Sequence, residues 1–366
     1  MNYKKYILAG IILLMVGYLL WYFNNIIAYV LISIVLSLLG APIVTFMSKF
    51  KIGKFKIPRA ISAMLALFLI WFSIILFIII FLPLIANEAK SLSEINPTEI
   101  IKNIDEPLNN LDAFISKYHL MGNQEILLKD YAAEKIISFA SVAKLSNILK
   151  VLIGILGNIF VAIFAISFIT FFFLKDDKLV TNVVFTIVPD KYDRAIKHIL
   201  LSIKKLLTRY FVGIVIDVIL MIVMITIGLT IIGLDFNHAI VIGLFAGIFN
   251  VVPYVGPIIA ILFGITMGIV THLNVDFYLV LVPLISYMLI VFVIAQIIDA
   301  VFIQPYIFSN SVKAHPLEIF LVIMIAGSFA GIIGMVLAIP SYTVLRVVAK
   351  EFFTSSEVVR KLTEKI

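Results

Sequence analysis

The sequence predicts an all-α polytopic membrane protein with about eight apolar segments, two of them broken by glycine and proline. Of the 366 residues, 63% are hydrophobic and 13% are charged. The mean hydropathy is +1.18, far above that of soluble proteins. The residues that give the net charge of +7 form short basic clusters between apolar runs, as the positive-inside rule expects. This distribution argues against nucleic acid as a partner and makes the lipid bilayer the first partner.

The composition also argues against an enzyme. The chain has no cysteine, which excludes disulfides, thiolate metal sites and cysteine nucleophiles. Its five histidines are scattered and do not form the helical His/Glu spacing of a metal site. Neither a phosphate-binding glycine loop with Lys-Ser/Thr nor a Gly-x-Ser-x-Gly elbow is present. We therefore expect no metal and no cofactor, other than a coupling ion such as H⁺ or Na⁺.

Residues 1–87 contain three predicted spans. The first, 6–23, lacks small residues at a cleavage position, so it is interpreted as a retained span. The second and third are 26–47 and 60–86. Five basic residues and no acid lie between them, which places this loop and the N-terminus in the cytoplasm.

Residues 88–150 are polar, with apolar residues at helical spacing. We expect a helical extracytoplasmic insertion, which could serve as an oligomer contact, a pore cap or a spacer.

Residues 151–209 are expected to hold a fourth span, 151–174, and a cytoplasmic amphipathic helix. The helix is predicted from one apolar stripe with lysines and arginines off it. Such a helix would lie on the inner membrane surface. The stripe consists of Ile196, Ile199, Leu200, Ile203, Leu206 and Leu207.

Residues 210–345 form the predicted core, which begins with a span over 210–234 that carries Asp217. This acid lies about 10 Å along the helix from Tyr210. A carboxylate at that depth costs a few kcal/mol unless it is paired, hydrated or protonated, so it marks a candidate functional site. The alternative is an acid that reaches the interface, or that bonds Arg209 or Lys205.

The next stretch, 239–270, is apolar and uncharged, but its middle is poor helix. It reads Asn250-Val-Val-Pro253-Tyr254-Val-Gly256-Pro257. Proline lacks a backbone donor and glycine admits unusual angles. Non-helical backbone at membrane depth survives only beside protein or a water-filled cavity, and such breaks mark transport sites. A proline kink in a passive span is the simpler alternative.

A span over 277–298 follows and leads into Asp299, Gln304 and Pro305. Gln296 and Asp299 are three residues apart and share a helix face, so with Gln304 they could offer oxygens to one path. An interfacial helix end is the alternative.

The last apolar stretch, 317–345, is interrupted at Gly327 and Ser328. The tail, 346–366, is basic and is expected in the cytoplasm.

The core therefore contains the same arrangement twice, an acid-bearing span followed by a broken stretch. Paired breaks at corresponding positions indicate a site between inverted repeats. The broken stretches 239–270 and 317–345 could be re-entrant hairpins or full crossings. Both alternatives leave the C-terminus inside, and the charge pattern does not separate them.

These motifs resemble the autoinducer-2 exporter family of membrane permeases. The resemblance is carried by the proline motif Asn250–Pro257, by Asp299-Ala-Val-Phe-Ile-Gln304-Pro305, by Ser309–Leu317, and by Gly327-Ser328 through Ile339-Pro340. Phe171–Asp176 and Arg209–Gly213 match the family's fourth and fifth spans. Ile214 and Ala300 stand where many members have a polar residue and an asparagine, which could alter what is carried.

The resemblance implies secondary transport in a prokaryotic plasma membrane, by a homo-oligomer. Some members resemble exporters of a small polar signalling molecule, and others resemble sodium(lithium)/proton antiporters. We expect an exporter of a small polar molecule coupled to an ion gradient, with the antiporter as alternative and a non-transporting scaffold behind both. The candidate substrate- or ion-binding residues are Asp217, Asn250, Pro253, Tyr254, Gly256, Pro257, Gln296, Asp299, Gln304, Pro305, Gly327 and Ser328.

Overall fold

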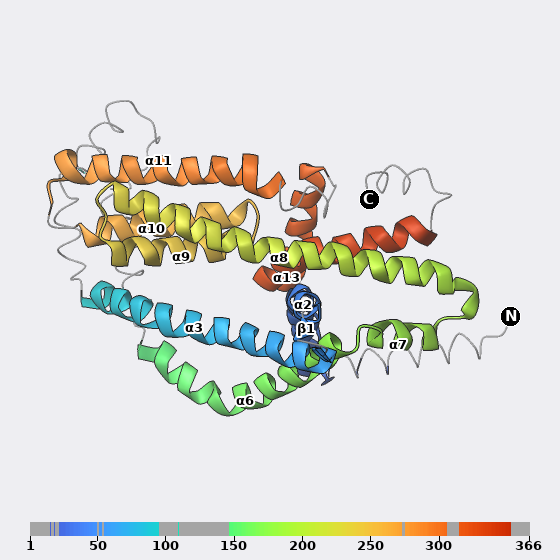
Figure 1. The fold of residues 1–366 in the computed structure, drawn as a ribbon. Coiled ribbons are helices and arrows are strands. Elements are labelled where there is room, and N and C mark those ends of the chain that lie inside the picture. The colour runs from blue at the N-terminus through green and yellow to red at the C-terminus, as the bar shows by residue number, and fades with distance from the viewer. Residues whose placement is uncertain are drawn as a thin grey trace. The chain divides into compact units, whose positions relative to one another are not determined.

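A computed structural model describes residues 15, 18, 22–49, 51–52, 55–94, 109, 146–272, 275–305 and 315–352. Over these residues the chain is helical, apart from the short antiparallel pair β1 (Lys51–Ile52) and β2 (Phe55–Lys56) (Figure 1). It divides into two compact units, Met1–Ile75 with Ile153–Phe211 and Leu76–Leu152 with Val212–Ile366. We describe each unit by itself.

Helices α2 (Asn24–Met47), α3 (Arg59–Glu94) and α6 (Ser146–Lys175) build the first unit around a small core. Val44, Ala63, Ala66 and Leu174 are its buried members. A Cβ at Gly40 would lie 3.1 Å from Leu174, so α2 and α6 pack closely there. Across the same unit, Trp71 Nε1 donates to Ser167 Oγ at 2.9 Å and Ser33 Oγ donates to the Ile166 carbonyl at 3.1 Å.

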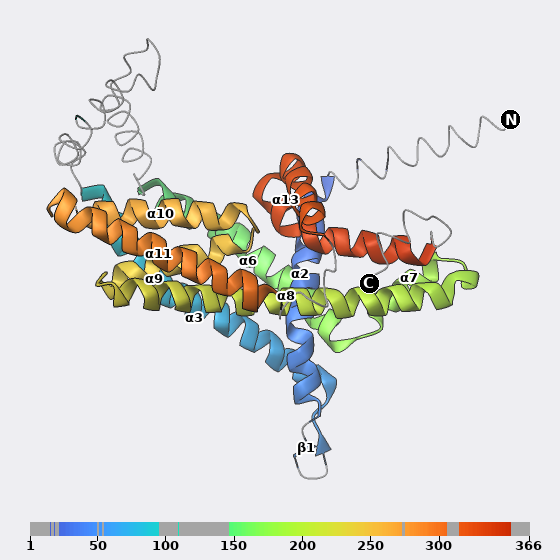
Figure 2. The same cartoon turned by 90° about the horizontal axis from the view of Figure 1, so that it is seen from above.

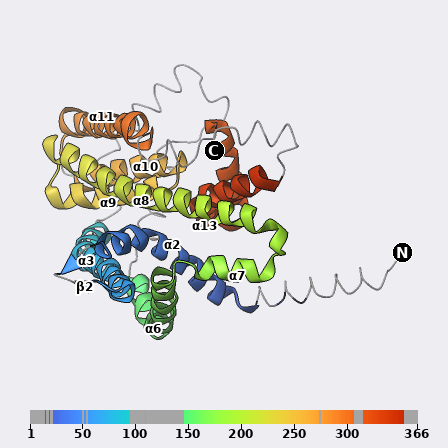
Figure 3. The same cartoon turned by 45° about the vertical axis from the view of Figure 1, so that its right-hand side comes forward.

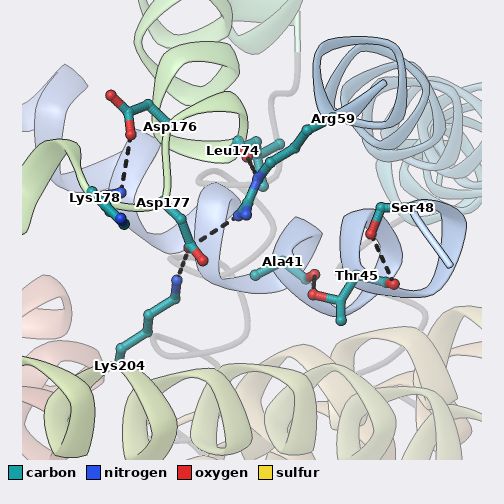
Figure 4. Close-up of polar contacts among 9 residues, drawn as sticks. All are labelled: Ala41, Thr45, Ser48, Arg59, Leu174, Asp176, Asp177, Lys178 and Lys204. Atoms are coloured by element: carbon teal, nitrogen blue, oxygen red, sulfur yellow. Dashed lines mark hydrogen bonds and ion pairs between the residues drawn. The ribbon is translucent and has the colours of Figure 1, made fainter. Parts of the chain in front are cut away.

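An ion cluster ties three parts of the first unit together (Figure 4). Asp177 lies between α6 and α7 (Leu179–Ile187) and contacts Arg59 at 3.1 Å and Lys204 of α8 (Asp193–Ile231). Partial burial alone would raise the pKa of Asp177, but the two cations outweigh it and hold the pKa below its ordinary value. The charged form of Asp177 is thus the one that the fold stabilises.

The second unit contains the rest of α8 with α9 (Phe236–Asn250), α10 (Val255–Thr271), α11 (Val282–Ile298) and α13 (Pro316–Phe352). Single π-helical turns, η2 (Phe277–Leu281) and η3 (Asp299–Ile303), precede and follow α11. Buried residues of α8 to α11 form one core, which includes Ile225, Leu229, Ile242, Met267, Met288 and Phe292.

Five of the described helices are long and apolar enough to cross a membrane: Asn24–Met47, Arg59–Asn87, Asp190–Ile231, Phe277–Ile303 and Leu317–Phe352. Three shorter apolar helices are Phe160–Lys175, Phe236–Asn250 and Val255–Thr271. The all-α polytopic class is therefore confirmed, and the count of eight segments stays a prediction. Most of the first predicted span, 6–23, and most of the insertion at 88–150 lie outside the described residues.

Both predicted breaks are present in the second unit. The first lies between α9 and α10, which contact each other side by side (Figure 1 and Figure 3). The second bends α13 at Ala330 and Gly331, where Gly331 has φ +57° and ψ −141°. Figure 2 shows α13 in red as two arms that meet at a bend.

The two breaks share one detail of packing. A Cβ on Gly256 would lie 1.8 Å from the Phe249 carbonyl oxygen, and a Cβ on Gly334 would lie 2.1 Å from the Ala326 carbonyl oxygen. No side chain larger than glycine fits such a distance without moving backbone. In both breaks, then, the start of the second arm presses against the end of the first.

Two parts of the structure differ from what the sequence suggested. Half of the apolar stripe assigned to the membrane surface, Ile196, Ile199 and Leu207, is buried in the protein, and its other three residues are half-buried. Their helix also continues through the expected boundary at 209 and 210 as one 39-residue α8. In addition, Arg346 was placed at the start of a cytoplasmic tail, but it is buried in α13, which ends only at Phe352.

Candidate functional site

Three predicted site residues from three different helices meet in the interior of the second unit. Asp217 lies on α8, Asn250 is the last residue of α9, and Asp299 directly follows α11. Their exposed fractions are 5%, 6% and 0%. Asp217 is therefore enclosed by protein rather than exposed at the surface of the unit.

Asn250 connects the two acids. Its Nδ2 donates to Asp217 Oδ2 at 3.0 Å and to Asp299 Oδ2 at 3.3 Å. An amide NH₂ group carries two protons, so one side chain can serve both carboxylates at once. The acids come from helices that precede different breaks, and the amide comes from the first break itself.

Two glutamines complete the surroundings of Asp299. Gln304 Nε2 donates to Asp299 Oδ2 at 2.8 Å, and Gln296 Nε2 lies 3.5 Å from the same oxygen. Gln304 reaches Asp299 through the π-helical turn η3, in which the Gln304 N–H bonds the Asp299 carbonyl five residues back. The sequence predicted these three residues together, and the structure brings them together.

The second carboxylate oxygen of each acid, Oδ1, lacks a hydrogen-bond donor of this kind. Asp217 Oδ1 and Asp299 Oδ1 are buried without a hydrogen-bond partner among the described residues. A buried carboxylate oxygen without a donor is costly, and native structures usually satisfy such atoms. These two oxygens are the atoms of the site at which a proton or a cation would find an acceptor.

The remaining residues of the first motif lie in or next to the turn between α9 and α10. Pro257 lies in the first turn of α10, where its missing N–H costs nothing. Tyr254 has a left-handed φ of +66°, is 45% exposed, and packs edge-on against Phe320 of α13 with ring centroids 5.6 Å apart. Pro253 is half-buried, and Pro305 follows Gln304 as an exposed residue.

The predicted residues of the second break, Gly327 and Ser328, take part in local packing and hydrogen bonding. A Cβ on Gly327 would lie 2.7 Å from the Met335 side chain, so this glycine serves the packing of the arms. Ser328 is exposed, and its Oγ donates to the Ile325 carbonyl at 2.7 Å. The acid cluster is built by the first break, by α8 before it, and by the end of α11.

Arg346 is a buried charge that the sequence analysis did not single out. It is 6% exposed, lies 5.6 Å from the Tyr342 ring centroid, and interacts electrostatically with Glu318 on the other arm of α13. Because Arg346 precedes further basic residues, the sequence analysis grouped it with the cytoplasmic tail. The spacing offers a signal: Thr343, Arg346 and Val347 are at positions i, i+3 and i+4 and so lie on one side of a helix, and Thr343 and Val347 are both buried.

A family comparison decides to which group of proteins this chain is related. The model for the AI-2E family of transporters matches residues 11–354. The chain belongs to the AI-2E transporter family. The resemblance found in the sequence motifs is thereby confirmed, and so is the assignment as a membrane transport protein.

Three relatives of this AI-2E transporter agree with the family match. The chain is 27% identical over 319 residues to YueF of Bacillus subtilis, covering 86% of this chain and 81% of the relative. It is 29% identical over 187 residues to YrrI of the same organism, covering 51% and 50%, and 23% identical over 337 residues to MJ1177 of Methanocaldococcus jannaschii, covering 90% and 91%. Each carries a name of the form "Putative transport protein".

Proposed function

We propose that this AI-2E transporter exports a small polar molecule coupled to an ion gradient, and that Asp217 and Asp299 are the coupling groups. The observation that carries the proposal is the bridge from Asn250 to both buried acids. Intramembrane acids are costly and are usually retained for ion or substrate pathways. Here two of them are held by one amide at a break in the helices.

The two acids take different roles in this proposal. Amide donors stabilise the charged form of a carboxylate. Asp299 is approached by the amides of Asn250, Gln296 and Gln304, whereas Asp217 receives one amide bond. We assign proton exchange to Asp217 and contact with the cation or solute to Asp299.

The proposal includes two re-entrant hairpins in inverted repeats. At 1.5 Å per residue, the 15 residues of α9 and the 17 of α10 span about 22 and 26 Å, less than the hydrocarbon core. The matching glycine contacts at Gly256 and Gly334 support a common origin of the two breaks. With this arrangement both termini are cytoplasmic in a prokaryotic plasma membrane, and the protein works as a homo-oligomer.

Sodium(lithium)/proton antiport is the second candidate, and one observation favours it. The buried oxygens Asp217 Oδ1 and Asp299 Oδ1 are acceptors without donors. Hard monovalent cations prefer oxygen ligands, and carboxylates exchange a cation for a proton readily. The export function instead uses the amides of Asn250, Gln296 and Gln304 for hydroxyl groups of a solute.

The test is a flux measurement in proteoliposomes loaded with a pH-sensitive dye. Wild type is compared with Asp217→Asn and Asp299→Asn, and with Asp235→Asn as control, since Asp235 is an exposed helix cap that asparagine can replace. A pH change on addition of sodium or lithium, lost in both core variants, identifies the antiporter.

The same vesicles, loaded with a labelled polyhydroxylated solute under a pH gradient, test export. Solute efflux that depends on the gradient and on both acids identifies the exporter. If folded wild-type protein moves neither ion nor solute, the coupling proposal fails and a scaffold function takes its place.

A further inference from the structure

The chemistry of the Asn250 amide limits what can enter between the two acids. Nδ2 directs its protons at Asp217 Oδ2 and Asp299 Oδ2, at 3.0 and 3.3 Å. This arrangement suits two charged, unoccupied carboxylates. An amide N–H cannot face a cation bound between these two oxygens, and a proton on either acid removes the charge that makes these hydrogen bonds strong.

Asn250 must therefore rearrange when the acids change state. It can rotate to present its Oδ1, or it can withdraw from the acids. A half-turn of the amide needs little space, but at 6% exposure the side chain cannot move away from the acids on its own, so withdrawal involves the backbone that carries it.

That backbone is the end of α9, directly before the break. The turn over 251–254 contains Tyr254 with its left-handed φ of +66°, a conformation that costs a non-glycine residue energy and persists only when its surroundings impose it. Phe249, the neighbour of Asn250, presses its carbonyl against Gly256 at the start of α10. A shift of Asn250 is thus transmitted directly to α10.

We propose that Asn250 is a positioning residue that couples the state of the Asp217–Asp299 pair to the conformation of the tip between α9 and α10. With both acids charged, the amide holds the tip in the conformation described here. When a proton or a cation binds, the acids lose negative charge, the hydrogen bonds from the amide weaken, and the tip is released. This role differs from contact with solute hydroxyls, and it rests on the proposed ion-coupling function of the two acids.

The test uses the absence of native cysteine. Ile258→Cys, on an α10 side chain that is 61% exposed, receives a nitroxide spin label in proteoliposomes. The label mobility is recorded as pH is stepped from 9 to 5 without sodium, and as sodium is added at pH 8. The expected result is a sigmoidal mobility change in each series, with the tip more mobile in the bound state.

Asn250→Ala is expected to abolish both changes and to leave the label mobile throughout. Asn250→Gln keeps the amide, and is expected to keep a response with a shifted midpoint. Asn237→Ala, an exposed asparagine at the other end of α9, is the matched control and is expected to behave as wild type. If Asn250→Ala did not fold, Asn250→Gln with an unshifted midpoint would overturn the inference.

Two outcomes separate this inference from the proposed function. A full response retained in folded Asn250→Ala overturns the coupling role of Asn250 alone, because the acids still sense ions. A wild-type label that responds neither to pH nor to sodium overturns both, since the acid pair then senses no ion.

Discussion

Gln304 lies five residues after Asp299, and its side-chain amide donates a 2.8 Å hydrogen bond to the Asp299 carboxylate. In an α-helix, residues five apart do not share a face, since each residue turns the helix by about 100°. The π-helical turn η3 removes this obstacle and directs both side chains to one point. The turn is therefore part of the site.

Gln304→Leu is predicted to lower the ion-coupled flux by about 10-fold or more. The substitution removes the shortest donor to a buried carboxylate, and hydrogen bonds to charged groups contribute about 1.5–3 kcal/mol. The dye assay in proteoliposomes measures the effect. Gln296→Leu is the control, and its 3.5 Å contact predicts a smaller loss. Equal losses in the two variants would contradict the ranking by distance.

Gly256→Ala is predicted to destabilise the protein by at least about 2 kcal/mol, at the upper range of overpacking costs. The new methyl group would lie 1.8 Å from the Phe249 carbonyl oxygen, which is backbone and cannot swing aside. Gly268→Ala is a matched comparison, because its methyl group would meet the flexible end of Met288. Thermal unfolding in detergent should show a clearly lower Tm for Gly256→Ala, and the reverse order would refute this packing argument.

Asp177→Asn is predicted to lower stability modestly at neutral pH, by about 0.5–1 kcal/mol as for exposed ion pairs. The fold lowers the pKa of Asp177, so its contribution is full above the ordinary value of about 4 and is lost as pH falls through the lowered folded value. Unfolding curves of the variant and wild type should therefore converge at acidic pH. They should also converge at 1 M salt, where exposed charges are screened. A difference that persists under both conditions would not come from this ion cluster.

Arg346→Ala is predicted to destabilise α13 by roughly 2 kcal/mol or more. It removes the cation beside the Tyr342 ring and leaves Glu318 without its opposite charge, and breaking a buried charge interaction is strongly destabilising. Adding Glu318→Gln should recover part of the loss, since the remaining charge disappears. A double variant that is additive in Tm would show that the two charges do not interact across the arms.

Local chemistry in the sequence was enough to predict the helices and the breaks. Long apolar runs predicted α2 and α3, and the backbone limits of Pro253 and Gly256 predicted the break between α9 and α10. The shared path predicted from sequence joined Gln296, Asp299 and Gln304. The contact of Asn250 with Asp217 and Asp299 was not predicted, because residues 33 and 49 positions apart have no local signal for contact.

The differences between expectation and structure at Ile196 and Arg346 have one physical origin. Ile196 and Arg346 were both assigned to surroundings by their chemical type, the first to lipid and the second to water. In a membrane protein an apolar stripe can face lipid or protein, and a cation can end a span or lie buried beside an acid and a tyrosine ring. Tertiary packing decides between these surroundings, and the chemical type of a single residue does not reveal which one applies.

The glycine contacts at the two breaks leave no free space between the backbones where each pair of arms meets. With backbone pressed on backbone at Gly256 and Gly334, neither tip can absorb motion by repacking a side chain. A displacement of the first hairpin then has to be taken up at a joint outside it. Gly233, with φ +97° and open space where a Cβ would lie, caps the end of α8, with its own N–H bonded to the Thr230 carbonyl and the Leu234 N–H bonded to the Leu229 carbonyl. The helix pair that carries Asn250 at the end of α9 is therefore joined to α8 through a single glycine cap.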